Sequence, residues 1–270
     1  MHGGPFFVVL VETFLDASTI TPTLTGYVLV ARRDRGGLRR KGGVAVFAKM
    51  EVARYVVFLE NSEVSERSWL MIHSDNGPIL FGAWYRRPSY GEVASIDILR
   101  TDIERLGTRV IGIVICGDMN VHHVKWLQFS RGISPAGRRL HEVCLDHELE
   151  ELTQKPTRGA HLLDLTLTDL GSHAYCTVLL GVSDHQMVLM RLDLPLYSDR
   201  TITRACFSYH AANWTGLNRY FMQYNWAGLF DGQTIDDMVI IFTNFVLEAA
   251  KSFIPFEWKE VNKKHTSMVE

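Results

Sequence analysis

The sequence has few of the features that assign a chain to a class at once. It contains only four cysteines in 270 residues, none of them in a CxxC pair. We therefore expect free thiols in a reducing compartment and no disulfide framework. The spacing of His141, Cys144 and His147 could suit zinc, but no second ligand pair accompanies it. We interpret these three residues as structural.

Long apolar runs and a strong charge of one sign are also absent. No apolar stretch reaches the roughly 20 residues that span a bilayer. The start of the chain lacks the basic leader of a signal peptide, so we expect an intracellular protein without a membrane anchor. The formal net charge of -2 provides no overall field for nucleic acid, and any such contact must come from a local patch.

Short apolar segments rich in β-branched residues dominate the first 196 residues and predict strands. These segments are 6–11, 27–31, 44–48, 54–59, 68–73, 79–85, 110–116, 163–168, 175–180 and 187–192. Apolar residues at helical spacing predict helices over 96–106 and 136–149. This mixture predicts an α/β fold, a four-layer sandwich of two packed mixed sheets with outer helices.

The character of the chain changes near residue 196. Residues 213–256 are rich in tryptophan, tyrosine and phenylalanine, and residues 235–253 have a helical pattern. We predict two domains, residues 1–196 and a small helical tail at 197–270. We interpret the aromatic side chains of the tail as packing groups and not as a platform for nucleobases.

Polar side chains stand at the ends of several predicted strands. Segment 110–116 ends in Gly117-Asp118-Met119-Asn120, and a later apolar stretch ends in Ser183-Asp184-His185. Hydrolysis of a phosphodiester needs a divalent cation on carboxylates, a positioned water and donors to the phosphate. The groups available for these tasks are Glu12, Asp118, Asn120, Asp164, Asp184 and His185. Together they predict metal-assisted hydrolysis of a phosphate ester.

Basic residues cluster in two places that could grip nucleic acid. The first cluster is Arg32, Arg33, Arg35, Arg39, Arg40 and Lys41, and the second is Arg86-Arg87. A charge run is more often a solvated loop than a binding site, so residue type alone leaves both interpretations open. If these residues bind DNA, the binding should be sensitive to salt and weakly dependent on sequence.

In its ordered motifs, the chain resembles the endonuclease/exonuclease/phosphatase superfamily, and within it the apurinic-like endonuclease domain of non-LTR (LINE-type) retrotransposons. The matching motifs include Val-Glu-Thr-Phe-Leu at 11–15, Ala-Trp-Tyr-Arg-Arg-Pro at 83–88, and those at 117–120, 137–140, 154–157, 163–168 and 183–185. The resemblance implies a magnesium-dependent hydrolase, with Mn²⁺ as an alternative ion, that nicks DNA and leaves a 3′-hydroxyl.

The resemblance also implies a role for each matched residue. Glu12 and Asp184 would belong to the metal site. Asp118 would activate or position the attacking water, and Asn120 would orient both. The basic clusters would contact phosphates on either side of the cleaved bond.

On the phosphate side, Tyr85 and His185 would contact the scissile group. Asp164 would fix the orientation and charge of the His185 imidazole. The motif of His122-His123 followed by Trp126 favours the retrotransposon branch over lipid or inositol phosphatases.

One departure from the family concerns the start of the chain. The family normally places a strand ending in asparagine, and then a helix, before the strand with the glutamate. Here Met1 lies only eleven residues before Glu12, and no asparagine precedes it. We expect one metal-site residue and one strand to be missing, and activity to be weak or absent.

The alternative is a non-catalytic nucleic-acid-binding remnant of a retrotransposon polyprotein that includes RNA-directed DNA polymerase. The tail resembles the connector to a reverse-transcriptase domain, which would be a partner in the parent polyprotein. A functional enzyme of this kind would be nuclear.

Overall fold

The computed structural model describes residues 4–35, 41–89, 91–181, 183–194 and 201–262. The chain forms two compact units, Met1–Ser198 and Asp199–Glu270, and each is described by itself. Among the described residues, no helix combines the length and apolar character needed to cross a membrane.

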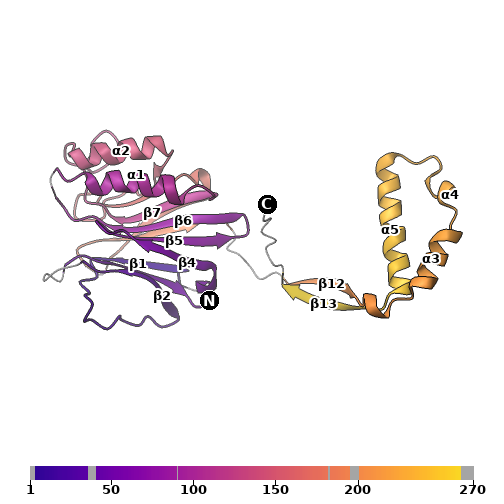
Figure 1. The fold of residues 1–270 in the computed structure, drawn as a ribbon. Helices are drawn as coiled ribbons and strands as arrows, with labels where there is room; N and C mark the ends of the chain where they lie inside the picture. The colour runs from indigo at the N-terminus through magenta and orange to yellow at the C-terminus, as the bar shows by residue number, and fades with distance from the viewer. Residues whose placement is uncertain (1–3, 36–40, 90, 182, 195–200, 263–270) are drawn as a thin grey trace. The chain divides into compact units, whose positions relative to one another are not determined.

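A six-stranded mixed sheet is the centre of the first unit (Figure 1). Its order is β4 (Val56–Asn61), β5 (Glu66–Ser74), β6 (Gly77–Tyr85), β7 (Gly112–Asp118), β9 (Asp164–Thr168) and β8 (Glu150–Glu151). Only β6 and β7 run parallel, because α1 (Ala94–Leu106) connects them. The apolar runs that predicted strands therefore pair into one buried sheet.

Helices α1 and α2 (Pro135–Asp146) cover one face of this sheet (Figure 1). Ser134 caps α2, because its hydroxyl accepts a hydrogen bond of 3.0 Å from the Gly137 amide. The first hydrophobic core lies between helices and sheet and includes Trp69, Leu80 and Ile115 from strands and Leu99 and Leu140 from helices. The apolar stripes that predicted the two helices face this core.

On the other face lie two smaller antiparallel sheets. One has the order β1 (Phe7–Val11), β3 (Val44–Lys49), β2 (Tyr27–Arg33), and the other pairs β10 (Ala174–Leu179) with β11 (Met187–Leu192). Both pack on a second core, formed by side chains such as Val46, Phe81 and Val114. The predicted α/β class with packed sheets and helices is confirmed, although only the six-stranded sheet is mixed.

The strand pairing shows how this second layer is divided. Within the described residues, β1 pairs with β3 along one edge, and neither β10 nor β11 pairs with β1. The layer is thus two separate sheets. Three short 3₁₀ turns, Ala53–Tyr55, Gly171–His173 and Tyr209–Ala211, complete the connections of the chain.

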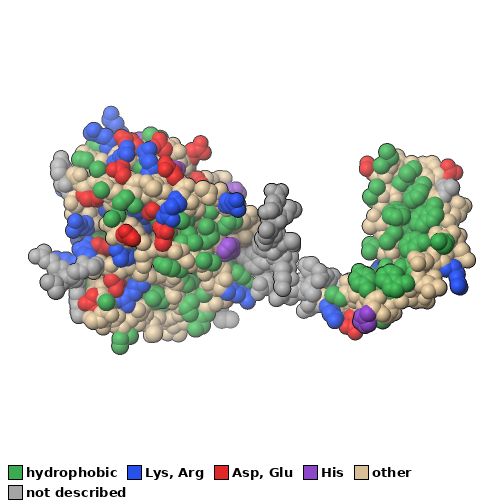
Figure 2. Space-filling model, in the orientation of Figure 1, with side chains coloured by type: hydrophobic (Ala, Val, Ile, Leu, Met, Phe, Trp, Pro, Cys, Tyr) green, Lys and Arg blue, Asp and Glu red, His purple; other side chains and the backbone are tan. Residues whose placement is uncertain are grey.

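The second unit consists of a hairpin and three helices. Strand β12 (Thr201–Phe207) pairs with β13 (Phe256–Asn262), and between them lie α3 (Trp214–Gln223), α4 (Trp226–Phe230) and α5 (Ile235–Phe253). The Phe245 ring contacts Tyr220, Tyr224 and Trp226, with centroids 5.4, 4.1 and 5.1 Å away. These aromatic side chains therefore pack the helices together, and many apolar side chains of the unit stay exposed (Figure 2).

Candidate active site

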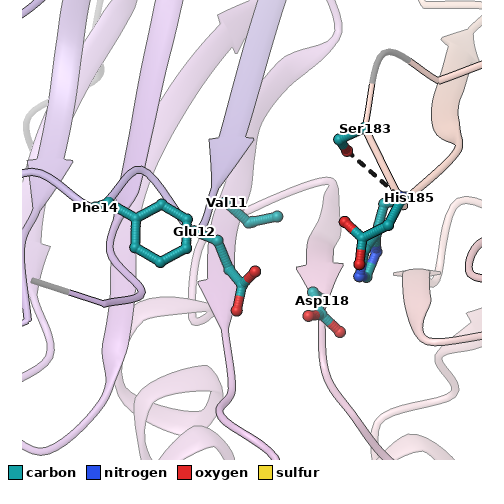
Figure 3. Close-up of a pocket in the computed structure, with 7 residues that line it drawn as sticks. Val11, Glu12, Phe14, Asp118, Ser183 and His185 are labelled. Carbon is teal, nitrogen blue, oxygen red and sulfur yellow. Dashed lines mark hydrogen bonds between the residues drawn. The ribbon is translucent and has the colours of Figure 1, made fainter.

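Strand ends from both layers of the first unit meet at one cavity of about 260 Å³. Its lining residues are Val11, Glu12, Phe14, Asp118, Ser183, Asp184 and His185. Figure 3 shows Glu12 at the end of β1 and His185 on the loop before β11, with Asp118 between them. The structure thus brings together residues that are more than 170 positions apart in the sequence, as the strand endings predicted.

Asp118 ends β7 and lies directly opposite Asp164 of β9 in the strand register. Its side chain is buried, and its Oδ1 atom has no hydrogen-bond partner. Burial, with the nearby Asp164 carboxylate second, raises the pKa of Asp118 to about 7. A water or cation in the cavity would give this oxygen the partner that the protein does not supply.

The backbone just before Asp118 requires glycine at position 117. Gly117 has φ +139°, and a Cβ there would lie 1.9 Å from the Trp84 carbonyl oxygen. This close contact lets the Arg86 amide donate to the Asp118 carbonyl at 2.8 Å. The Gly-Asp motif is therefore a backbone requirement of the site as well as a source of a carboxylate.

Asp164 and His185 form a hydrogen-bonded pair, with 2.7 Å between Asp164 Oδ2 and His185 Nδ1. This bond raises the pKa of His185. The other ring nitrogen, Nε2, is buried and has no partner. A protonated His185 could therefore donate from Nε2 to a ligand while Asp164 holds the ring.

Thr157 supports this pair from outside the cavity, and only its Pro-Thr motif marks it in the sequence. Its buried hydroxyl accepts hydrogen bonds from the amides of Leu163 and Asp164, at 3.1 and 3.0 Å. Its carbonyl accepts one from the Gln186 amide at 2.6 Å. One residue thereby fixes the strand of Asp164 and the loop of His185.

Glu12 and Tyr85 meet at the opposite wall, where the Tyr85 hydroxyl donates to the Glu12 carboxylate. Burial and this carboxylate raise the pKa of Tyr85, so the phenol stays protonated and can donate. The Arg35 guanidinium lies 5.7 Å from the centre of the Tyr85 ring and binds Glu66. Asn120 lies nearby with φ +48°, and its side-chain amide donates to the Arg86 carbonyl at 2.9 Å.

Asp184 differs from the other carboxylates of the cavity because it has a cationic partner. Arg158 pairs with it at 2.6 Å, and both side chains are about half exposed or more, at 48% and 65%. Among the described residues, no three His, Cys, Asp or Glu side chains converge as a preformed metal site. Mg²⁺ is usually held by one or two carboxylates and waters, and Glu12 with the free Oδ1 atom of Asp118 fits that need.

Most of the arginines predicted to contact phosphates form hydrogen bonds or ion pairs within the protein. Arg32 binds Asp34 and the carbonyls of Asp16 and Thr19, which holds the loop after β1. Arg86 is 3% exposed and pairs with Glu92. These guanidiniums stabilise loops around the cavity, and Arg86 is not at the surface.

The remaining basic residues are divided between bound and exposed groups. Arg33 donates to the Glu63 carbonyl at 3.1 Å, and Arg35 is held by Glu66. Lys41 and Arg87 are exposed. Arg39 and Arg40 lie outside the described residues. Within the described part of the two predicted clusters, Lys41 and Arg87 are therefore the exposed basic residues.

Opposed carboxylates, an aspartate–histidine pair and a tyrosine at the ends of packed sheets define a phosphoesterase-type α/β domain. The family profile described as endonuclease-reverse transcriptase matches residues 79–189. The first unit resembles endonuclease/exonuclease/phosphatase-superfamily domains of the non-LTR retrotransposon type, as the motifs predicted.

A curated protein of Drosophila melanogaster, "Probable RNA-directed DNA polymerase from transposon X-element", is 28% identical over 250 residues. That match covers 86% of this chain and 26% of the relative, so the chain spans about a quarter of the relative's length. The fold resembles an AP endonuclease from Leishmania major, with 13% identity, a TM-score of 0.56, and coverage of 72% of this chain and 79% of that one. It also resembles a 3′-5′ exonuclease from Neisseria meningitidis, with 17% identity, a TM-score of 0.51, and coverage of 71% and 91%.

Proposed function

We propose that the first unit is a magnesium-dependent DNA endonuclease that nicks one strand and leaves a 3′-hydroxyl. The observation that carries the proposal is the cavity where Asp118, the Asp164–His185 pair and the Glu12–Tyr85 pair converge. The cavity combines a carboxylate that can take a proton with two neutral or cationic donors. These are the groups that in-line hydrolysis of a phosphodiester requires.

Glu12 and Asp118 are the residues that would hold the cation, with waters completing its shell and Asp184 joining once it leaves Arg158. Mn²⁺ would suit the same oxygen ligands. The ion would supply charge neutralisation at the phosphate. The raised pKa of Asp118 supports this assignment, because a buried carboxylate beside a second carboxylate is stabilised by a nearby positive charge.

In the proposed reaction, a water attacks phosphorus on the side opposite the 3′ oxygen. Asp118 accepts a proton from this water, and Asn120 holds the segment that presents the carboxylate. His185 Nε2 and the Tyr85 hydroxyl donate to the phosphate oxygens as their charge grows. The bond from phosphorus to the 3′ oxygen breaks, and the departing 3′ oxygen takes a proton from solvent water to become the 3′-hydroxyl.

The direct test is nicking of supercoiled plasmid DNA in Mg²⁺. We expect Asp118→Ala to remove nicking, since one proton-transfer group contributes roughly 10²- to 10⁴-fold to rate. Asp146→Ala is the matched control, because Asp146 pairs with Arg100 on the α2 surface. The nicks of the active protein should prime a DNA polymerase directly, which reports a free 3′-hydroxyl.

Two outcomes would contradict the proposal in different ways. Nicking that survives Asp118→Ala would remove Asp118 from the mechanism. Salt-dependent DNA binding without cleavage in either Mg²⁺ or Mn²⁺ would identify a non-catalytic nucleic-acid-binding remnant instead.

The proposal includes a parent polyprotein and a location. The Drosophila relative is named as an RNA-directed DNA polymerase and is far longer than the matched part. We propose that the second unit is the connector toward such a polymerase. An endonuclease that nicks chromosomal DNA would act in the nucleus.

A further inference from the structure

Phe14 is a large apolar side chain at the mouth of the cavity that the reaction above does not use. It lines the cavity and is 50% exposed. In Figure 3 its ring lies beside Glu12, on the wall opposite His185. A single exposed apolar side chain is ordinary on a protein surface, so the feature that distinguishes Phe14 is its position next to the reacting groups.

The backbone holds Phe14 in this position at a cost. Phe14 has φ +53° and Glu12 has φ +52°, in the left-handed region that residues with a side chain rarely adopt. Such conformations persist where the surroundings impose them, and they gather at ligand-binding and catalytic sites. Two of them within three residues set the direction of both the Glu12 carboxylate and the Phe14 ring.

A neighbouring loop braces this strained segment. The Phe14 amide donates to the Gly42 carbonyl at 2.8 Å. Gly42 packs so closely that a Cβ there would lie 2.9 Å from a Tyr85 ring carbon. The segment is therefore fixed against the same tyrosine that binds Glu12, and Phe14 is presented by a rigid frame.

Other phenylalanine side chains in this part of the fold are buried or partly buried, in contrast to Phe14. Phe7, seven residues earlier, stacks on Phe81 between the sheets with ring centroids 6.2 Å apart, and Phe47 of β3 is 3% exposed. Phe14 instead presents an uncharged aromatic face beside carboxylates. If the phosphate bound in the cavity belongs to a nucleotide, the nucleobase of that nucleotide would lie close to this wall. An aromatic side chain can stack on such a base.

We propose that Phe14 is a specificity-determining residue that stacks on a nucleobase next to the scissile phosphate. This inference rests on the proposed function and adds to it. The substrate class is a nucleic acid with a base unstacked at the cut site, as opposed to a phosphate ester without a base.

The test measures binding and does not require turnover. Fluorescence anisotropy would compare two labelled single-stranded 12-mers in Ca²⁺: one with normal bases, and one with abasic tetrahydrofuran residues throughout. We expect Phe14→Ala to weaken binding of the first by roughly tenfold and to leave binding of the second unchanged. Phe14→Trp should restore binding. Phe58→Ala is the control, because Phe58 is 45% exposed on β4 and does not line the cavity.

A spectroscopic measurement adds a second readout. Oligonucleotides with 2-aminopurine at successive positions should lose fluorescence at one position on binding the native protein or Phe14→Trp, and keep it with Phe14→Ala. Equal binding of both probes by the native protein and Phe14→Ala, or equal losses on both probes, would overturn the inference. Failure of the native protein to bind either probe would instead count against the proposed function.

Discussion

The two layers that form the cavity differ in how firmly the fold holds them. Asp118 and Asp164 stand on β7 and β9, and all five residues of β9 are buried. Glu12 and His185 stand at the ends of β1 and β11, whose residues are intermediate or exposed. The opposed carboxylates are thus built into a rigid core, and the two residues facing them come from sheets with less support.

The largest expected effect is a difference in the free energy of unfolding between two leucine-to-alanine variants, one in each layer. Leu80→Ala in β6 opens the first core, where Leu80 is 0% exposed, and should lower the free energy of unfolding by about 2–5 kcal/mol. Leu10→Ala in β1, where the leucine is 43% exposed, should cost less than about 1 kcal/mol. Urea denaturation of both variants measures the difference. Equal losses would show that the second layer is as firmly held as the first.

The next prediction tests the contact that joins the layers. Asp164→Asn keeps the shape of the side chain but removes the charge that orients His185 and raises its pKa. We expect kcat for nicking to fall by roughly 100-fold or more, with KM nearly unchanged. The lower pKa of His185 should also move the alkaline limb of the pH profile to lower pH. An unshifted profile with reduced kcat would mean that Asp164 acts only through the fold.

A smaller effect should appear in the pH dependence of stability without metal. The pKa of Asp118 rises from 3.8 to about 7 on folding, so between these values the unfolded state binds fewer protons than the folded state. Stability attributable to Asp118 therefore falls as pH rises from about 4 to 7, and stays lower above 7. Asp118→Asn should be about 1–3 kcal/mol more stable than the native protein at pH 8.

Urea unfolding in EDTA at pH 5 and pH 8 measures this difference. Added Mg²⁺ should stabilise the native protein and not the Asp118→Asn variant. A variant that is less stable than the native protein at pH 8 would contradict an unfavourable charge on Asp118, which is caused first by its burial and then by the nearby Asp164.

The smallest effect concerns the exposed pair on the weaker layer. Arg158 forms an ion pair with Asp184, so Arg158→Gln should tighten Mn²⁺ binding by roughly two- to fivefold, the range for an exposed ion pair. Calorimetric titration with Mn²⁺ measures the affinity. The same substitution in an Asp184→Asn background should have no effect, and an undiminished gain there would mean that Arg158 acts through its general charge.

The sequence predicted what depends on short segments. Strands over 110–116 and 163–168 and the polar groups at their ends predicted that Asp118 and Asp164 lie close together, and the structure places them opposite each other in neighbouring strands. Tyr85 needed the resemblance, and nothing near Glu12 or Tyr85 in the sequence indicates that the two side chains meet.

What the sequence did not reveal are contacts between distant segments. The resemblance implied that the basic cluster contacts phosphates. In the structure, Arg32 and Arg35 form ion pairs with Asp34 and Glu66. The Arg158–Asp184 pair and the outward turn of Phe14 likewise depend on loops that pack only in the folded chain. The periodicity of apolar residues predicts which residues are buried. It does not predict which charged residues form ion pairs.

Thr157 has a consequence for how copies of such a gene lose function. Its hydroxyl and carbonyl hold the backbone of Asp164 and of the His185 loop, although it has no chemistry of its own. A copy with valine at this position would keep every side chain that handles the phosphate and would still encode a folded protein. A check of the catalytic side chains alone would score that copy as intact. In a mobile element that accumulates substitutions, inventories of catalytic residues would therefore overcount the copies able to move.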